Sequence, residues 1–154
     1  MAKPKQPAGT PVISNRKAYR NYSIDEEFEA GIVLSGCEVK MVRQGSFSLR
    51  EAYCEIRDGE LWLVGSHIPE YPQASSHVAV DPLRRRKLLL NRHELRRLRR
   101  RVIEKGFTVV PLKAYFVRGR VKLKIGLARG KRQYDKRETI KRRDIDRDQA
   151  RLRK

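Results

Sequence analysis

The chain has no long hydrophobic run, few cysteines and few acidic side chains. No stretch of the 154 residues approaches the roughly 20 consecutive apolar residues that span a bilayer, so we expect no transmembrane segment. The first residues, Met1-Ala2-Lys3-Pro4-Lys5, contain neither the apolar core of a secretory signal nor the glycine needed for N-myristoylation. These absences favour a cytoplasmic protein without a membrane partner.

Residues that could form a catalytic or metal site are also sparse. Cys37 and Cys54 belong to no C-x-x-C pair, so we interpret them as free thiols. His67, His77 and His93 share no ligand spacing with each other or with either cysteine. The chain has no G-x-G-x-x-G motif and no P-loop, and its acids are scattered rather than clustered for a metal. We therefore expect no enzymatic activity, no cofactor and no metal site.

Acidic residues number only 18 against 37 lysines and arginines, which gives a formal charge of +19. Because self-repulsion opposes the folding of a compact domain, this excess is better explained by a partner with dense negative charge. Nucleic acid is the first candidate, since neutralising phosphates releases condensed counterions, and an anionic membrane surface is the second. The charge concentrates in three stretches, which are Arg16-Lys17-Arg20, Arg84-Arg85-Arg86-Lys87 together with the arginines of residues 96–101, and the segment from Lys131 onward.

The type of basic residue narrows the choice of partner. Arginine predominates in the second stretch. Its planar guanidinium pairs bidentately with phosphates and stacks on bases, which favours structured RNA over a diffuse screen of charge.

The first half of the chain has the pattern of a strand followed by a short helix. We predict a strand from Tyr19 to Leu34 with a bulge or turn around Glu26-Glu27. A short helix from Glu38 to Arg43 follows, with Val39 and Val42 facing inward. Residues 67–83 contain three prolines and little periodicity, so we interpret them as a loop.

Two hairpins are indicated by their turn residues. Residues 53–57 and 60–64 flank Asp58-Gly59, the favoured sequence for a type I′ turn. Residues 107–116 and 120–127 flank Arg118-Gly119, and the second run alternates apolar residues with lysines. Each hairpin places two antiparallel strands side by side.

One longer helix is predicted between these hairpins. Asn91 can cap it, with Glu94 three residues later as in a capping box. Leu95, Leu98 and Val102 then line one face. Gly106 suits the position after the helix. Four arginines fall on the face opposite the apolar residues, namely Arg96, Arg97, Arg100 and Arg101.

These elements predict a mainly β-protein with helices, organised as one domain between two tails. Local hairpins favour a small antiparallel barrel of about six strands, with two or three helices filling its ends, of the oligonucleotide-binding (OB-like) kind. We assign residues 1–14 to a disordered arm, residues 15–130 to the barrel and residues 131–154 to a basic tail. The tail contains 11 basic and 5 acidic side chains but few aliphatic ones, so we expect it to be disordered alone and helical on a partner.

Two side chains have alternative interpretations from the residues alone. Tyr134 is an aromatic inside a basic segment, so it either stacks on an unpaired base or anchors the tail to the barrel. Glu29 lies in an acidic patch, where it either accepts from base amino groups or balances surface charge.

Taken together, the sequence closely resembles the SmpB family, the SsrA-binding proteins that partner bacterial transfer-messenger RNA. The matching stretches run in family order from about residue 15 to 143. They are Asn15-Arg16-Lys17-Ala18, Phe28 to Gly36 with Glu38-Val39-Lys40, Gly59 to Leu63, His67-Ile68-Pro69, Arg86 to Leu90, Val109 to Leu112, Ala128 to Lys131, and Tyr134-Asp135-Lys136-Arg137.

The resemblance implies a non-enzymatic adaptor. Such a protein binds the tRNA-like domain of transfer-messenger RNA and supports its delivery to stalled ribosomes in trans-translation, which tags the unfinished peptide. The expected partners are transfer-messenger RNA and the RNA of the ribosome, with elongation factor Tu and alanyl-tRNA synthetase reached indirectly through the RNA. We expect the protein to act as a monomer. A structural ribosomal protein and a general RNA chaperone stay open as alternatives.

Site residues follow from the resemblance position by position. Asn15, Glu29 and Leu89 match residues important for binding transfer-messenger RNA, and Lys40 is a nearby contact. With them we assign Arg16, Lys17 and Lys131 to the same RNA. Tyr134 matches a ring that stacks in the decoding centre, and the tail is expected to fold as a helix in the empty mRNA channel. The tail residues assigned to the ribosome are Tyr134, Asp135, Lys136, Arg137, Lys141, Arg142 and Arg143.

Overall fold

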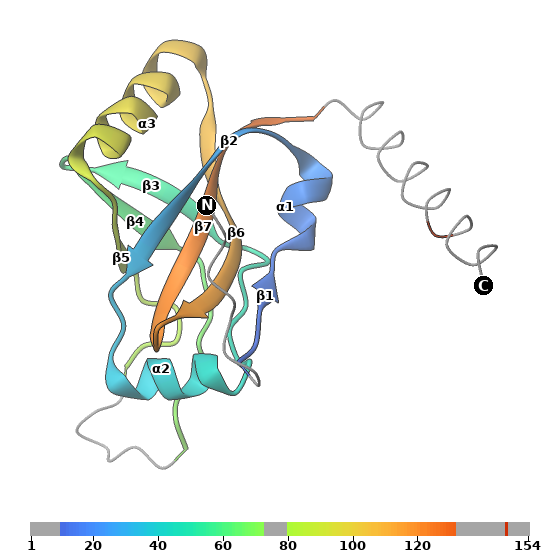
Figure 1. Cartoon of the computed structure of the whole chain (residues 1–154), viewed down its shortest axis with the longest axis vertical. Helices are drawn as coiled ribbons and strands as arrows, with labels where there is room; N and C mark the ends of the chain where they lie inside the picture. The colour runs from blue at the N-terminus through green and yellow to red at the C-terminus, as the bar shows by residue number, and fades with distance from the viewer. Residues whose placement is uncertain (1–9, 73–79, 132–146, 148–154) are drawn as a thin grey trace.

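The computed structural model describes residues 10–72, 80–131 and 147. These residues form a mainly antiparallel seven-stranded sheet with three helices (Figure 1). In chain order the elements are β1 (Ile13–Ser14), α1 (Arg16–Asn21), β2 (Tyr22–Ile32), α2 (Gly36–Arg43), β3 (Tyr53–Arg57), β4 (Glu60–Val64), β5 (Arg86–Leu89), α3 (Arg92–Lys105), β6 (Thr108–Val117) and β7 (Arg120–Gly130).

The sheet closes on itself. Its strands pair in the order β1-β6-β3-β4-β5-β2-β7, and a further β6–β7 pairing joins the two sides. Strands β2 to β7 therefore form a ring, which leaves few open edges for unwanted pairing. The predicted mainly antiparallel β-protein with about six strands and helices is confirmed, whereas its assignment to the OB-like class stays a prediction.

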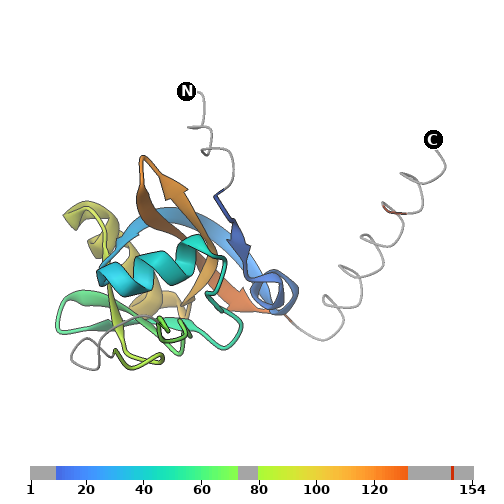
Figure 2. The same cartoon turned by 90° about the horizontal axis from the view of Figure 1, so that it is seen from below.

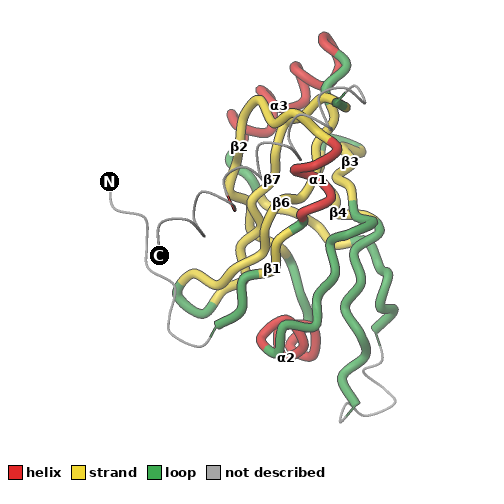
Figure 3. Tube along the Cα trace, turned by 90° about the vertical axis from the view of Figure 1, so that its right-hand side faces the viewer, coloured by secondary structure: helices red, strands yellow, loops and turns green. Residues whose placement is uncertain are grey.

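The core fills this ring, and two helices cover its ends. Figures 1 and 3 show α3 and α2 at opposite ends, and Figure 2 shows α2 lying across the near end. Met41 and Val42 of α2 and Leu98 of α3 are buried in the same apolar cluster as Leu63 and Phe116 of the strands. No helix among the described residues is long and apolar enough to cross a membrane.

The beginning of the domain differs from the sequence prediction. Ile13 and Ser14 were assigned to a disordered arm, but they form β1 because they pair with Ala114 and Lys113 of β6 and because Ile13 packs against the core. The strand predicted from Tyr19 begins only at Tyr22, after the helix α1. Residues 1–9 lie outside the described residues.

Both predicted hairpins are confirmed. Arg57 pairs with Glu60 across the first turn, where Asp58 and Gly59 have φ angles of 52° and 74°. Arg118 and Gly119 have φ angles of 51° and 78° in the second turn. Positive φ at both central residues is the requirement of a type I′ turn. A register shift between Ile24 and Glu26 confirms a bulge just before the position expected for it.

Helix capping is where the local prediction was wrong. The side chain of Asn91 forms no capping hydrogen bond in α3. A capping box forms instead in α2, where the hydroxyl oxygen of Ser35 accepts from the amide of Glu38 and the Glu38 carboxylate accepts from the amide of Ser35. This capping box was not predicted because the helix was expected to begin at Glu38, whereas α2 begins at Gly36 with Ser35 as its cap.

Candidate nucleic-acid interface

Asn15 is the residue on which α1 depends. Its side chain is buried, and its oxygen accepts from the amide of Ala18 at 3.3 Å, so that it caps the helix. Its Nδ2 donates to the carbonyl of Pro111 at 2.9 Å, and its backbone amide donates to Leu112 at 2.8 Å. Both polar atoms of the side chain are therefore engaged inside the protein, and Asn15 orients α1 on β6.

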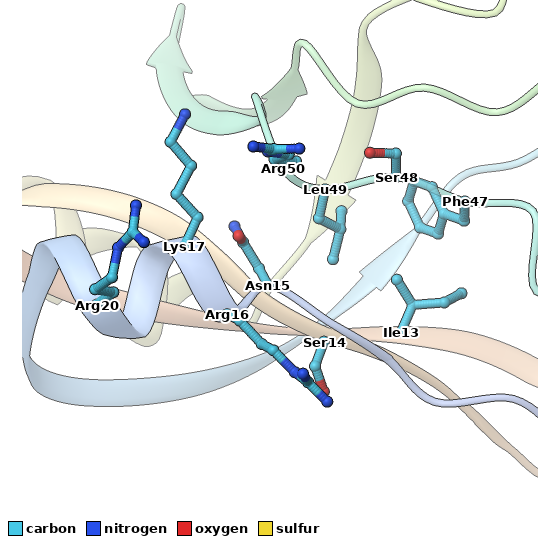
Figure 4. Close-up of a pocket in the computed structure, with 10 residues that line it drawn as sticks. All are labelled: Ile13, Ser14, Asn15, Arg16, Lys17, Arg20, Phe47, Ser48, Leu49 and Arg50. Carbon is cyan, nitrogen blue, oxygen red and sulfur yellow. The ribbon is translucent and has the colours of Figure 1, made fainter. Parts of the chain in front are cut away.

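Beside α1 lies a cavity of about 470 Å³, which we call the α1 pocket (Figure 4). It is lined by Ile13, Ser14, Asn15, Arg16, Lys17, Arg20, Phe47, Ser48, Leu49 and Arg50. Lys17 and Arg20 extend on the side of α1 that faces Arg50, while Arg16 extends on the other side beside Ser14. Four cations surround the cavity, and the described residues that line it include no acid.

One acid lies just outside the pocket. Glu51 accepts from Lys17 at 3.0 Å and lies 4.0 Å from Arg50. The hydrogen bond from Lys17 lowers the pKa of Glu51, but all three side chains are exposed enough that water screens these pairs. The pocket therefore keeps a positive potential that suits a phosphate group.

Lys131 joins this group from the end of β7. Its Nζ donates to the carbonyl of Tyr19 at 3.2 Å, and its amide donates to Asn21 at 2.9 Å. The structure thus places four of the predicted RNA-binding residues at α1: Asn15, Arg16 and Lys17 at its start and Lys131 against its end. Arg50 was not predicted, because a single arginine in a loop carries no local pattern that links it to α1.

Glu29 and Leu89 lie together on another part of the ring. Gly31 pairs with Leu89 across β2 and β5, and Glu29 precedes Gly31 by two residues on the same face. Leu89 is 51% exposed and lines a cavity of about 280 Å³ with residues of β2, α2, the β6–β7 turn and the start of β7, among them Lys122 of β7. We call this cavity the Leu89 pocket.

Glu29 has a hydrogen-bond partner on β6. Its carboxylate accepts from the hydroxyl of Tyr115. Burial and this hydrogen bond raise the pKa of the Tyr115 hydroxyl. Lys124 lies opposite Glu29 in the register but pairs with Glu27 at 3.6 Å. Tyr115 was not singled out from the sequence, although its position outside the core in an alternating strand was a usable signal.

Lys40 lies in neither pocket. It is exposed on α2, where its Nζ lies 5.0 Å from the centre of the Tyr71 ring. The tail residues assigned to the ribosome, Tyr134, Asp135, Lys136, Arg137, Lys141, Arg142 and Arg143, lie outside the described residues.

A buried ion pair fixes α2 against β5, which carries Leu89. Glu38 accepts from Arg86 at 2.7 Å and also from Arg84. Arg86 is fully buried, and its guanidinium further donates to the carbonyls of Ser66 and Pro82 at 3.0 Å each. Burial raises the pKa of Glu38, but hydrogen bonds from the two arginines and from the Ser35 amide outweigh it, so its pKa lies below the ordinary value.

The described residues contain no group of three or more His, Cys, Asp or Glu side chains that could hold a metal. Cys37 and Cys54 are free thiols, and burial raises the pKa of the Cys54 thiol. The side chains at the two pockets can bind a partner through charge, hydrogen bonds and apolar contact.

Comparison with known proteins agrees with this architecture. A family model described as SmpB protein matches residues 12–154. The SsrA-binding protein of Nitrosomonas europaea is 52% identical over 141 residues, which cover 92% of this chain and 93% of that protein. The SsrA-binding protein of Paraburkholderia xenovorans is 50% identical, covering 92% of this chain and 95% of that protein.

A solved structure is also similar. It is described as "tmRNA-SmpB: a journey to the center of the bacterial ribosome", and the likeness has a TM-score of 0.65 at 48% identity. The match covers 84% of this chain and 94% of the solved one. On the family model and on these relatives, this chain belongs to the SmpB family.

Proposed function

We propose that this chain is an RNA-binding adaptor that binds the tRNA-like domain of transfer-messenger RNA and delivers it to stalled ribosomes for trans-translation. The relatives are named for binding SsrA, and the similar solved structure concerns tmRNA-SmpB and the ribosome. The observation that carries the proposal is the α1 pocket, where four cations, Arg16, Lys17, Arg20 and Arg50, surround a cavity and no acid is found among the lining residues that the structure describes.

The two pockets are proposed to bind different parts of the RNA. The cations of the α1 pocket hold backbone phosphates, which fix the register of the RNA on the protein. Leu89 offers an exposed apolar surface to a base or sugar, and Glu29 accepts hydrogen bonds from base amino groups. Asn15 contributes indirectly, because its buried side chain sets the orientation of α1.

The tail supplies a second, separate contact. Residues 131–154 are proposed to become helical in the mRNA channel, with Tyr134 stacking on a base of the decoding centre. Elongation factor Tu and alanyl-tRNA synthetase are reached through the RNA, and the chain acts in the cytoplasm as a monomer that binds without catalysing a reaction.

A binding assay with matched variants tests the proposal. Fluorescence anisotropy at fixed salt compares the tRNA-like domain with an unrelated folded RNA of equal length. Lys17→Gln with Arg20→Gln removes two charges from the α1 pocket. Arg96→Gln with Arg100→Gln removes two charges from α3, which lies on the other side of the ring (Figures 1 and 2).

The proposal expects a selective result. The α1 variant should weaken binding of the tRNA-like domain about tenfold and reduce the salt slope by about 2, since each lost phosphate contact reduces that slope by about 1. The α3 variant should leave this binding within about twofold. Equal affinity of the parent protein for both RNAs, or equal losses in both variants, would show general RNA binding.

A further inference from the structure

The exposed side of α3 carries a concentration of charge that neither pocket uses. Arg92, Arg96, Arg99 and Arg100 are all exposed, and none forms an ion pair with a side chain that the structure describes. We call these four residues the arginine face. Their neighbour Arg97 pairs instead with Glu26 of β2 at 3.3 Å.

Contacts on the inner side of α3 hold this face toward solvent. Leu98 is fully buried, and Leu95 and Val102 pack against the core. Arg101, which the sequence pattern placed opposite the core, lies over the ring of Phe107 at 4.7 Å and pairs with Asp25 of β2. The acids of β2 thus neutralise Arg97 and Arg101, and the arginine face keeps its charge.

The arginine face opposes the local stability of the helix. Arg92, Arg96 and Arg100 are spaced four residues apart, and like charges at that spacing repel. Arg92 also stands in the first turn, where the helix dipole disfavours a cation, and the cap residue Asn91 forms no side-chain capping bond. Because folding gains nothing from these charges, a partner that carries negative charge accounts for them.

The geometry indicates phosphates as the groups recognised. Three arginines follow one another along a rigid helix at steps of about 6 Å, so they present a straight row of guanidinium groups. Arginine can stack on unpaired bases, but surfaces that do so generally combine it with aromatic rings, and the ring that α3 contains, that of His93, lies outside the arginine face. A row of forked donors without rings suits the backbone of a double helix, which is recognised by shape and phosphate position.

We propose that the arginine face binds the phosphate backbone of double-helical ribosomal RNA while the α1 pocket holds transfer-messenger RNA. The two surfaces lie on different sides of the ring (Figures 1 and 2), so a second RNA can reach α3 when the first is bound. Naming the ribosome as the source of this RNA rests on the proposed function.

The experiment measures binding of the full chain to purified ribosomes and, separately, to the isolated tRNA-like domain, across a salt series. The test variant is Arg96→Gln with Arg100→Gln. The control is Arg43→Gln with Arg118→Gln, two exposed arginines that lie on α2 and at the β6–β7 turn, at the other end of the ring from α3. Thermal unfolding is measured for each variant.

The proposal expects the α3 variant to bind ribosomes about tenfold more weakly, with a salt slope reduced by about 2. Its binding of the tRNA-like domain should stay within about twofold, and its melting temperature should be unchanged or higher because like charges are removed. The control should leave ribosome binding within about twofold.

Three outcomes overturn the proposal. Unchanged ribosome binding shows that the arginine face has no ribosomal partner. An equal loss in the control shows an effect of net charge alone. If the α3 variant still binds more weakly than the parent after the RNA of the ribosome is digested and its proteins are retained, the partner of the arginine face is a protein. If the parent protein fails to prefer the tRNA-like domain, the proposed function fails, but the comparison on ribosomes still decides the role of α3.

Discussion

Replacing Glu38 with glutamine tests how α2 and β5 are held in place. Glu38 is 4% exposed and accepts from Arg86, which is fully buried. Glutamine keeps the volume of the side chain but removes its charge, so a guanidinium is left in the interior without its counter-charge. Arg84 cannot replace the lost negative charge beside Arg86, because Arg84 is itself a cation. Breaking a buried pair from one side costs about 3–5 kcal/mol.

Urea unfolding followed by circular dichroism measures this loss directly. A loss of this size corresponds to a fall in melting temperature of roughly 10 °C. The control is Glu55→Gln, which removes the exposed partner of Arg85 and should cost less than about 1 kcal/mol. A loss below about 1 kcal/mol for Glu38→Gln, or one equal to the control, would refute the assignment of this pair as the tie between α2 and β5.

A double-mutant cycle separates the pair from its surroundings. Glu38→Leu with Arg86→Met removes both charges and should cost less than the sum of the two single changes, because neither single change can avoid leaving a buried charge. Additive losses would mean that the two side chains act independently.

Three further predictions concern pH and backbone geometry. The pKa of Glu38 lies below its ordinary 4.5, so the stabilisation that it provides is complete above pH 4.5 and is lost as the pH falls through the folded-state pKa. The difference in unfolding free energy between the parent and Glu38→Gln should therefore become smaller at low pH. A difference that does not change with pH would contradict this. Gly65→Ala should lower the free energy of unfolding in urea by more than about 1 kcal/mol, since φ is +80° and the added Cβ would lie 2.8 Å from the carbonyl oxygen of Glu51. Gly59→Ala is the matched control, because Gly59 also has a positive φ but an added Cβ there meets no atom within 4 Å. An equal loss in both variants would exclude the clash at Gly65. Asn15→Ala should cost about 1–3 kcal/mol because it removes the side-chain cap of α1 and takes the Asn15 donor away from the carbonyl of Pro111. If it weakened RNA binding with unchanged stability, Asn15 would be a direct contact rather than the residue that orients α1.

The accuracy of the sequence predictions depended on how local the determining contacts are. The hairpin at Asp58-Gly59 was predictable because the turn residues themselves require positive φ. The helix α1 was missed because it is only six residues long and depends on Asn15 reaching Pro111, 96 residues away. Likewise, nothing near Glu38 indicates that Arg86 meets it across 48 residues.

In the candidate site, too, residues in a local pattern were predicted, whereas residues brought in by the tertiary fold were not. Arg16 and Lys17 were predicted from a short basic stretch and line the α1 pocket, and Lys131 contacts the end of the same helix. Arg50 enters the same pocket from a loop between α2 and β3, which requires the tertiary fold. The neutralisation of Arg101 by Asp25 also changed the interpretation of α3, because charges that were equivalent in sequence are not equivalent in space.

A reconstituted tagging reaction tests the central claim most directly. Ribosomes stalled at the end of a truncated mRNA are supplied with aminoacylated transfer-messenger RNA and elongation factor Tu, with or without the purified full chain. The account predicts that the peptide tag is added only when the chain is present. A chain ending before Tyr134 should still bind the tRNA-like domain but add no tag. Tagging that does not depend on the chain, or loss of RNA binding on removal of the tail, would contradict the account.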